Sequence, residues 1–237
     1  MLQNNRMTTC VSGYWPVKNK HDTKYNNWFN NTLSVNCPYV FFSDKGGIEF
    51  IKQFRKDLPT YYIELEIKDF ECYKYKDVLK THPVHCPSTE LNLIWHEKIF
   101  LVKRASELNP FNSEWFHWVD AGHCIYRNIK PPSSVFPNPD KLNKLPKDKF
   151  IYSSSEVYDE SKISKTNYYH NIAGTSHIMH KNMIVVFVKK YKEYLEELSD
   201  SNTVITDQVV LTHICKYNKD MFYKLCDGYG EVTRFLY

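Results

Sequence analysis

The chain has 237 residues, of which 42% are hydrophobic and 16% aromatic, and its formal net charge is +4 at pH 7. This length allows one large domain with a buried core, whereas no apolar run approaches the roughly 18 residues that would cross a bilayer. Residues 1–9 are mostly polar and lack the apolar core of a signal peptide. We therefore expect a cytoplasmic protein with no transmembrane segment.

Charge and cysteine content narrow the function classes further. The net charge is modest, and Lys and Glu are interleaved over residues 189–197, which is typical of a solvated helix face rather than a nucleic-acid-binding surface. Seven cysteines, none of them in a Cys-x-x-Cys pair, favour reduced thiols over a disulfide framework. Aromatic residues near Asn, His and Ser are suited to stacking on a sugar or a base.

Strand-like and helical segments alternate through the first half of the chain. Runs rich in Val, Phe, Tyr and Trp predict strands at residues 7–11, 39–42, 61–67 and 116–119. Apolar spacing predicts helices at residues 25–33, 48–54 and 88–108. Ser88 is the expected N-cap of the third helix, and Asn109-Pro110 ends it. This alternation predicts an α/β fold with a mostly parallel central sheet flanked by helices.

The second half departs from strict alternation and begins with a Pro-rich stretch at residues 131–146. The strands expected after it are 150–154 and 169–179, and the helices are 184–198 and 206–217. No internal repeat or low-complexity tail interrupts the chain. We expect a single domain over residues 1–237, with the nucleotide-binding half at residues 1–125.

Two of the expected strands end on a carboxylate. Residues 116–119 lead into Asp120, which a glycine follows two positions later, and residues 39–42 lead to Asp44. Open α/β sheets bind ligands at the carboxyl ends of their strands, and hard oxygen ligands suit Mg²⁺ or Mn²⁺. Asp120 is therefore a candidate metal ligand. In the structural alternative, Asp120 only begins a turn in which Gly122 supplies a positive φ.

Motifs for other nucleotide chemistries are missing. Ser12, Gly13 and Tyr14 follow the first strand, where a glycine allows a ligand close to the backbone. No Gly-x-Gly-x-x-Gly or Gly-x₄-Gly-Lys-[Ser/Thr] motif occurs, which argues against a dehydrogenase and a P-loop NTPase. His82 and His85 beside Cys86 would suit zinc, but the motif offers no fourth ligand.

Four further side chains have both a structural and a functional interpretation. Lys98, inside the long helix, is either solvent-exposed or reaches a phosphate or Asp120. Gly174 lies in a strand-like segment, where a glycine marks a bulge or the approach of something bulky. Asp207 and Gln208 follow Thr206 at a helix start, where they complete the helix end or hold sugar hydroxyls.

Together these segments resemble the HtrL/YibB-like family of sugar transferases, which are glycosyltransferases of the A-type, Rossmann-like nucleotide-diphospho-sugar transferase fold. The block from Trp95-His96-Glu97-Lys98 to Trp118-Val119-Asp120-Ala121-Gly122 carries most of the resemblance. The rest of it lies in residues 8–12, 39–44 and 207–208. The resemblance implies transfer of a hexosyl or N-acetylhexosaminyl group from a nucleotide-diphosphate donor, with UDP-sugar favoured, to a glycan or protein acceptor.

The resemblance also implies roles for individual residues. Asp207 and Gln208 would be catalytic and orient the transferred sugar. The implied donor-binding residues are Thr9, Ser12, Tyr14, Asp44, Lys98, Ala121 and Gly122. The implied acceptor-binding residues, in the acceptor-side half at residues 126–237, are Asn171, Gly174 and Thr175. Mn²⁺ or Mg²⁺ would bind Asp120, with Asp227 as the second ligand, and a homodimer is left open.

This chain departs from the related retaining transferases at two points. Gly122 stands at the third position of their Asp-x-Asp motif, and their late metal-binding His is replaced at best by Asp227. Two alternatives to an active transferase therefore stay open. One is an inactive protein that binds nucleotide sugars or glycans. The other is a nucleic-acid-binding protein, whose affinity would depend strongly on salt and need no metal.

Overall fold

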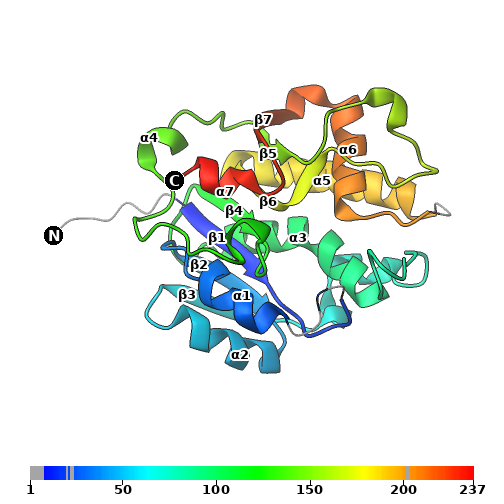
Figure 1. The fold of residues 1–237 in the computed structure, drawn as a ribbon. Coiled ribbons are helices and arrows are strands. Elements are labelled where there is room, and N and C mark those ends of the chain that lie inside the picture. The colour runs from blue at the N-terminus through cyan, green and yellow to red at the C-terminus, as the bar shows by residue number, and fades with distance from the viewer. Residues whose placement is uncertain (1–7, 20, 22–23, 201–202) are drawn as a thin grey trace.

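The computed structural model describes residues 8–19, 21, 24–200 and 203–237. These residues form a twisted central sheet with helices on both faces (Figure 1). The sheet has seven strands in the described residues, in the order β3-β2-β1-β4-β6-β5-β7. The strands are β1 (Thr8–Gly13), β2 (Tyr39–Ser43), β3 (Thr60–Glu64), β4 (Trp115–Val119), β5 (Phe150–Ser154), β6 (Ile172–His180) and β7 (Phe222–Asp227).

Strand direction explains where a ligand can bind. β1 pairs in parallel with β2 and with β4, and β2 pairs in parallel with β3. β6 runs antiparallel to both β4 and β5, whereas β7 is parallel to β5. The chain therefore moves outward from β1 to β3 and then returns to place β4 on the other side of β1. A reversal of strand order of this kind opens a crevice at the carboxyl ends of the strands.

Both faces of the sheet are buried, because successive side chains of a strand point to opposite sides. In β4, Phe116 and Trp118 join one apolar cluster while Trp115 and Val119 join the other. Helices α3 (Thr89–Leu108), α5 (Lys181–Ser199) and α6 (Asp207–Tyr217) contribute to the first cluster. Helices α1 (Tyr25–Thr32), α2 (Lys45–Arg55), α4 (Pro139–Leu142) and α7 (Glu231–Phe235) contribute to the second.

The structure confirms the α/β fold and most of the expected elements. β2, β4 and β5 match their predicted residues within one position, as do α1 and α6. Ser88 caps α3, since its Oγ accepts a hydrogen bond from the Leu91 N–H at 3.2 Å. Asn109 ends that helix in the left-handed conformation, with φ 37°. The strong local signals of buried strands and capped helices were therefore sufficient here.

Other boundaries differ from the prediction. β1 continues through Ser12 to Gly13, whereas a loop was expected from residue 12, and Met7 lies outside the described residues. β3 ends at Glu64, and Ile67–Asp69 form a 3-10 turn rather than strand. The Pro-rich stretch contains α4, which Asn138 caps. The sequence patterns missed β7 and α7 entirely, because α7 has only five residues and β7 is half exposed.

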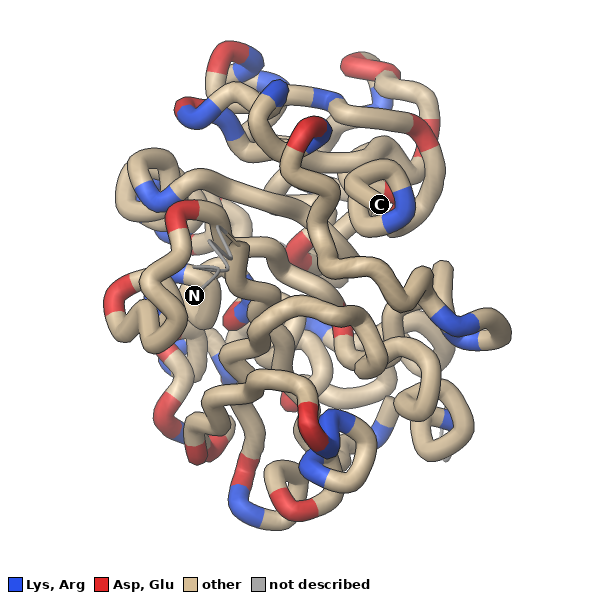
Figure 2. The backbone as a smooth tube through the Cα atoms, turned by 90° about the vertical axis from the view of Figure 1, so that its left-hand side faces the viewer, with Lys and Arg blue, Asp and Glu red and all other residues tan. Residues whose placement is uncertain are grey.

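Two surface properties bear on the function classes. Among the described residues, no helix has the length and apolar character needed to span a bilayer. Lys and Arg segments alternate with Asp and Glu segments over the side of the molecule shown in Figure 2, with no broad region of one sign. A protein that binds the phosphates of a nucleic-acid backbone would instead have basic residues clustered on one face.

Candidate functional site

A cavity lies at the crevice between the carboxyl ends of β1 and β4. Its volume is about 540 Å³, which is within the range of small-molecule sites. Tyr14 follows β1, and Asp120 and Gly122 follow β4. Asp207 enters from the start of α6, and Tyr229 enters from the segment after β7. Both halves of the chain thus line one cavity.

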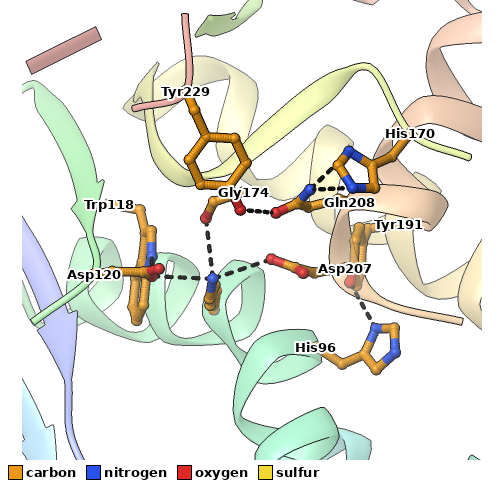
Figure 3. A network of polar contacts seen from close by, with 10 residues as sticks. His96, Trp118, Asp120, His170, Gly174, Tyr191, Asp207, Gln208 and Tyr229 are labelled. Carbon is orange, nitrogen blue, oxygen red and sulfur yellow. Dashed lines mark hydrogen bonds and ion pairs between the residues drawn. The ribbon is translucent and has the colours of Figure 1, made fainter. Parts of the chain in front are cut away.

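Lys98 joins two of these segments in the wall of the cavity, where Asp120, Gly174 and Asp207, labelled in Figure 3, converge on one side chain. Its Nζ lies 3.0 Å from Asp120 Oδ1 and 3.1 Å from Asp207 Oδ2. The same Nζ donates a hydrogen bond to the Gly174 carbonyl at 3.0 Å. A lysine ammonium has three N–H donors, so these contacts use all of them. Lys98 therefore reaches Asp120, as one of its interpretations required, and has no donor left for a phosphate.

Burial and charge act in opposite directions on this group of side chains. Burial alone would lower the pKa of Lys98, but the carboxylates of Asp120 and Asp207 outweigh it and hold that pKa above its ordinary value. Burial raises the pKa of Asp120, although Lys98 and the Trp118 N–H oppose the shift. A buried ammonium between two carboxylates stays protonated at neutral pH, because each carboxylate favours its charged form.

Two more contacts fix Asp120. Trp118 stands two positions earlier in β4 and therefore points to the same side. Its Nε1 donates a hydrogen bond to Asp120 Oδ1 at 2.7 Å. The Asp120 backbone N–H donates to the Thr175 carbonyl at 2.9 Å. Asp120 Oδ1 thus accepts from both Trp118 and Lys98, and its carboxylate orientation is set before any ligand binds.

The segment after β4 is held by α1. Thr32 Oγ1 donates a hydrogen bond to the Ala121 carbonyl. A Cβ added at Gly122 would lie 2.4 Å from Tyr25 Cε1 and 2.8 Å from Tyr25 Cδ1. Such contacts are too short for a side chain, so the Tyr25 ring occupies the space that an Asp at position 122 would need. The packing of Tyr25 in this structure is therefore incompatible with an Asp-x-Asp pattern at residues 120–122.

A second polar network lies beside the first. Gln208 Oε1 accepts a hydrogen bond from the Tyr229 hydroxyl, and Gln208 Nε2 lies 2.8 Å from His170 Nδ1. Asp207 and Gln208 also restrict Gly174, where an added Cβ would lie 2.5 Å from Asp207 Oδ2 and 2.8 Å from Gln208 Cγ. Thr206 makes no side-chain cap at this helix start. Asp207 and Gln208 thus take part in cavity contacts beyond their places in the helix.

The structure brings many of the predicted site residues together. Tyr14, Lys98, Asp120, Ala121, Gly122, Thr175, Asp207 and Gln208 line the cavity. Gly174 joins them through its carbonyl contact with Lys98. These residues come from segments that are distant in sequence, so the order of strands and helices is what assembles them.

Five predicted residues lie elsewhere. Thr9 is fully buried in β1 and bonds to Ser113, and Ser12 is buried in the same strand. Asp44 is the N-cap of α2 and accepts a hydrogen bond from the Gly47 N–H at 2.6 Å, so its role in the structure is to cap this helix. Asn171 and Asp227 are also outside the cavity lining, and the Asp227 carboxylate is 79% exposed and paired with Lys224.

The side chains present do not fit the expected divalent cation with Asp120 and Asp227 as its ligands. Gly122 offers no carboxylate, and Asp227 is not a cavity residue. Asp120 Oδ1 already accepts two hydrogen-bond donors. Within residues 8–237, excluding the undescribed positions, no three His, Cys, Asp or Glu side chains cluster in a way that could hold a metal. The expected two-carboxylate metal site is therefore not formed by these side chains.

Sequence patterns did not identify several cavity residues. His21, Tyr25, Arg127, His170 and Tyr229 all line the cavity. Gly228 and Gly230 flank Tyr229 with φ angles of 107° and 80°, so the Gly-Tyr-Gly sequence was a usable signal for a special backbone at that tyrosine. The other four stand in loops and helices without a distinctive pattern.

Comparison with known proteins gives a family match and distant likenesses to solved structures, among them a synthase and a glycosyltransferase. No curated protein matches the chain. A 4-diphosphocytidyl-2C-methyl-D-erythritol synthase from Anaerococcus prevotii aligns at 12% identity with a TM-score of 0.43, over 96% of this chain and 90% of that one. The apo glycosyltransferase GlyE from Streptococcus pneumoniae aligns at 8% identity with a TM-score of 0.49, over 92% of this chain. This chain covers 44% of GlyE, less than half of its length.

The family model described as "Bacterial protein of unknown function (HtrL_YibB)" matches residues 60–233. That range holds α3, β4, the start of α6 and Tyr229, and so most of the cavity described above. The match confirms the resemblance that residues 95–122 indicated. The chain therefore belongs to the HtrL_YibB family.

Proposed function

We propose that this protein transfers a sugar from a nucleotide-diphosphate donor, with a UDP-sugar favoured, to a glycan or protein acceptor. The observation that carries the proposal is the Asp120–Lys98–Asp207 group in the wall of the cavity at the β1–β4 crevice, in which Lys98 and Asp207 are buried and Asp120 is partly buried. Mutually fixed ionisable groups in a crevice, here with the pKa values of Lys98 and Asp120 raised, are typical of an active site.

The cavity suits both parts of the donor. Tyr14 and Tyr25 supply aromatic rings beside the end of β1 for the base or the sugar. Asp120 and Asp207 present carboxylates that accept hydrogen bonds from ribose or sugar hydroxyls. Lys98 acts in this proposal as a positioning residue, because its three N–H donors are already used.

The reaction breaks the bond between the sugar and the diphosphate and forms a bond from the same sugar carbon to an acceptor oxygen or nitrogen. The acceptor releases its proton to water, and the leaving diphosphate keeps the electron pair of the broken bond as negative charge. Asp207 and Gln208 would orient the sugar, and orientation of this kind contributes mainly in the transition state. Tyr229 and His170 hold Gln208 from opposite ends of its amide.

The test uses donor binding and turnover together. Purified protein is titrated with UDP in a calorimeter and then incubated with UDP-sugars while released UDP is measured. Asp207→Asn leaves Lys98 paired with Asp120, so we expect nearly unchanged melting but turnover lowered by more than about tenfold. Asp44→Asn, outside the cavity, is the matched control and should turn over normally. Normal turnover by Asp207→Asn would remove Asp207 from the catalytic residues.

One alternative has a specific observation in its favour. The three N–H groups of Lys98 are already used, and position 122 is a glycine. The cavity therefore offers a ligand fewer charged side chains than an Asp-x-Asp transferase does. A protein that binds nucleotide sugars without turnover would show calorimetric binding of UDP and no release of UDP from any UDP-sugar. Donor binding with turnover supports the transferase, and binding of neither UDP nor UDP-sugars contradicts both.

A further inference from the structure

Arg127 is a charged residue of the cavity lining that the proposed reaction has not used. It follows the short 3-10 turn at Cys124–Tyr126, in the segment that leaves β4. Lys98 and Arg127 are the lysine and arginine side chains in the lining of this cavity. Since Lys98 is enclosed by its three acceptors, Arg127 is the cation of the lining that has donors to offer a ligand.

The guanidinium is held in a fixed orientation. Its Nε donates a hydrogen bond to the Gly122 carbonyl at 3.0 Å. Its Cζ lies 4.0 Å from the centroid of the Trp28 ring, a cation–π contact. One Nη2 lies 3.4 Å from His21 Nε2. These contacts fix the plane of the group, so the entropy lost on binding an anion is small.

Arg127 keeps unused donors. A guanidinium carries five N–H groups, and the contacts above involve Nε and Nη2. Among the described residues, no carboxylate forms an ion pair with Arg127, whereas Lys98 and Arg234 each have such a partner. A planar cation with free donors in a cavity matches a diphosphate, because arginine binds phosphate oxygens in pairs.

The position relative to Asp120 is also suitable. Arg127 Nε donates a hydrogen bond to the carbonyl of Gly122, which stands two residues after Asp120. Tyr25 lies among these charges: burial raises its pKa to about 12, Asp120 adds to the rise, and Arg127 and Lys98 oppose it. Asp120 and Arg127 therefore act on the same phenol from the same segment of chain.

Resting on the function proposed above, we propose that Arg127 binds the diphosphate of the donor and takes the place of a divalent cation held by two carboxylates. Lys98, Asp120 and Asp207 together carry one net negative charge and would repel a diphosphate. Arg127 supplies the opposite charge in the same cavity. The leaving diphosphate is then stabilised by a fixed guanidinium, and donor binding needs no added metal.

The experiment measures binding of UDP, inorganic pyrophosphate and uridine by calorimetry, each in EDTA and in Mn²⁺. Arg127→Gln removes the charge but keeps a polar side chain. We expect it to weaken UDP and pyrophosphate by about tenfold or more, and to leave uridine unchanged because uridine has no phosphate. Arg127→Lys keeps the charge without the paired donors. Its affinity for UDP and pyrophosphate should lie between that of the wild type and that of Arg127→Gln. Exposed Arg104 on α3 gives the control, Arg104→Gln, with wild-type affinities.

The outcomes separate this inference from the proposed function. Wild-type UDP affinity in folded Arg127→Gln, or UDP binding that requires Mn²⁺, overturns the role of Arg127 and leaves the transferase standing. Pyrophosphate binding that depends on Arg127, without UDP binding, supports the diphosphate site and contradicts the transferase. Failure of the wild type to bind either compound overturns both. Melting curves of the two Arg127 variants confirm that each is folded.

Discussion

Lys98 stabilises the fold by separating the buried carboxylate of Asp207 from the partly buried carboxylate of Asp120. Replacing it with Met leaves Asp120 and Asp207 close together without a cation, and breaking a buried pair in this way costs about 3–5 kcal/mol. We expect Lys98→Met to lower the free energy of unfolding by that amount in urea titrations. Lys103→Met, on the same helix but with a partly exposed side chain in weak ion pairs, should cost less than about 1 kcal/mol.

A second substitution checks the origin of that loss. If the cost of Lys98→Met comes from two unpaired carboxylates, adding Asp207→Asn should restore part of the stability, because only Asp120 then remains charged. The loss of stability should be smaller in the double variant than in Lys98→Met alone. Additive losses would assign the effect to packing of the lysine stem instead.

Gly122 is required by the Tyr25 ring rather than by backbone conformation. Gly122→Ala places a Cβ 2.4 Å from Tyr25 Cε1, and overpacking of this kind typically costs about 1–3 kcal/mol. We expect Gly122→Ala to melt earlier. Tyr25→Ala opens that space, so the double variant Gly122→Ala/Tyr25→Ala should be no less stable than Tyr25→Ala alone. A further full loss in the double variant would contradict the steric explanation.

At the scale of an element, α3 and α6 begin with similar residues but different contacts. Ser88 Oγ caps α3 through the Leu91 N–H, whereas Thr206 at the start of α6 makes no side-chain cap. We expect Ser88→Ala to cost about 0.5–2 kcal/mol and Thr206→Ala only a few tenths of a kcal/mol. Chemical denaturation of the two variants measures the difference. Equal losses would show that capping does not distinguish these helices.

At the scale of the whole molecule, buried histidines predict acid sensitivity. Burial lowers the pKa of His96 to about 4, and the pKa values of His117 and His123 to about 3. Below about pH 6.5 the unfolded chain therefore binds more protons at these sites than the native state does. The stability contributed by the neutral rings is present above that pH and is lost as the pH falls toward the native pKa values.

Glu97 opposes this loss of stability in acid, because here the native state binds one proton more than the unfolded chain. Burial raises the pKa of Glu97 to about 7, so its native state binds the extra proton between that pH and about 4.5. Burial also lowers the pKa values of His177, His180 and His213, so the histidines together outweigh Glu97 and the free energy of unfolding should fall as the pH falls below about 6.5. Urea titrations across pH 5–6 measure the slope. His117→Gln should reduce it by about 1.4 kcal/mol per pH unit, and an unchanged slope would exclude His117.

His117 and His123 also connect distant parts of the molecule. Both accept or donate at Thr233 Oγ1, at 3.0 Å and 2.9 Å, and Ser176 bonds the same hydroxyl. Thr233 lies in α7, so this buried network fastens the last helix to β4 and β6. Protonation of either ring would place a charge in that network, which gives the acid sensitivity a structural location.

The sequence by itself determined most of the secondary structure and the central candidates of the site. Buried strands such as β2 and β4 are continuous apolar runs, and a local pattern is enough to find them. Lys98, Asp120 and Asp207 could be selected because each stands at a strand end, on a helix leading to it, or at a helix start. β7 could not be found in this way, because an edge strand with a half-exposed sequence has little periodicity.

Only the tertiary structure decided what each selected residue contacts. Asp44 and Asp120 have the same place in the sequence pattern, at the end of a buried strand, yet Asp44 caps α2 and Asp120 binds Lys98. The saturation of Lys98, the Tyr25 ring against Gly122 and the arrival of Arg127 in the cavity depend on helices packed from distant segments. Local propensity specifies a helix or strand, whereas long-range packing determines which side chains are in contact. The chemistry of this cavity depends on those contacts.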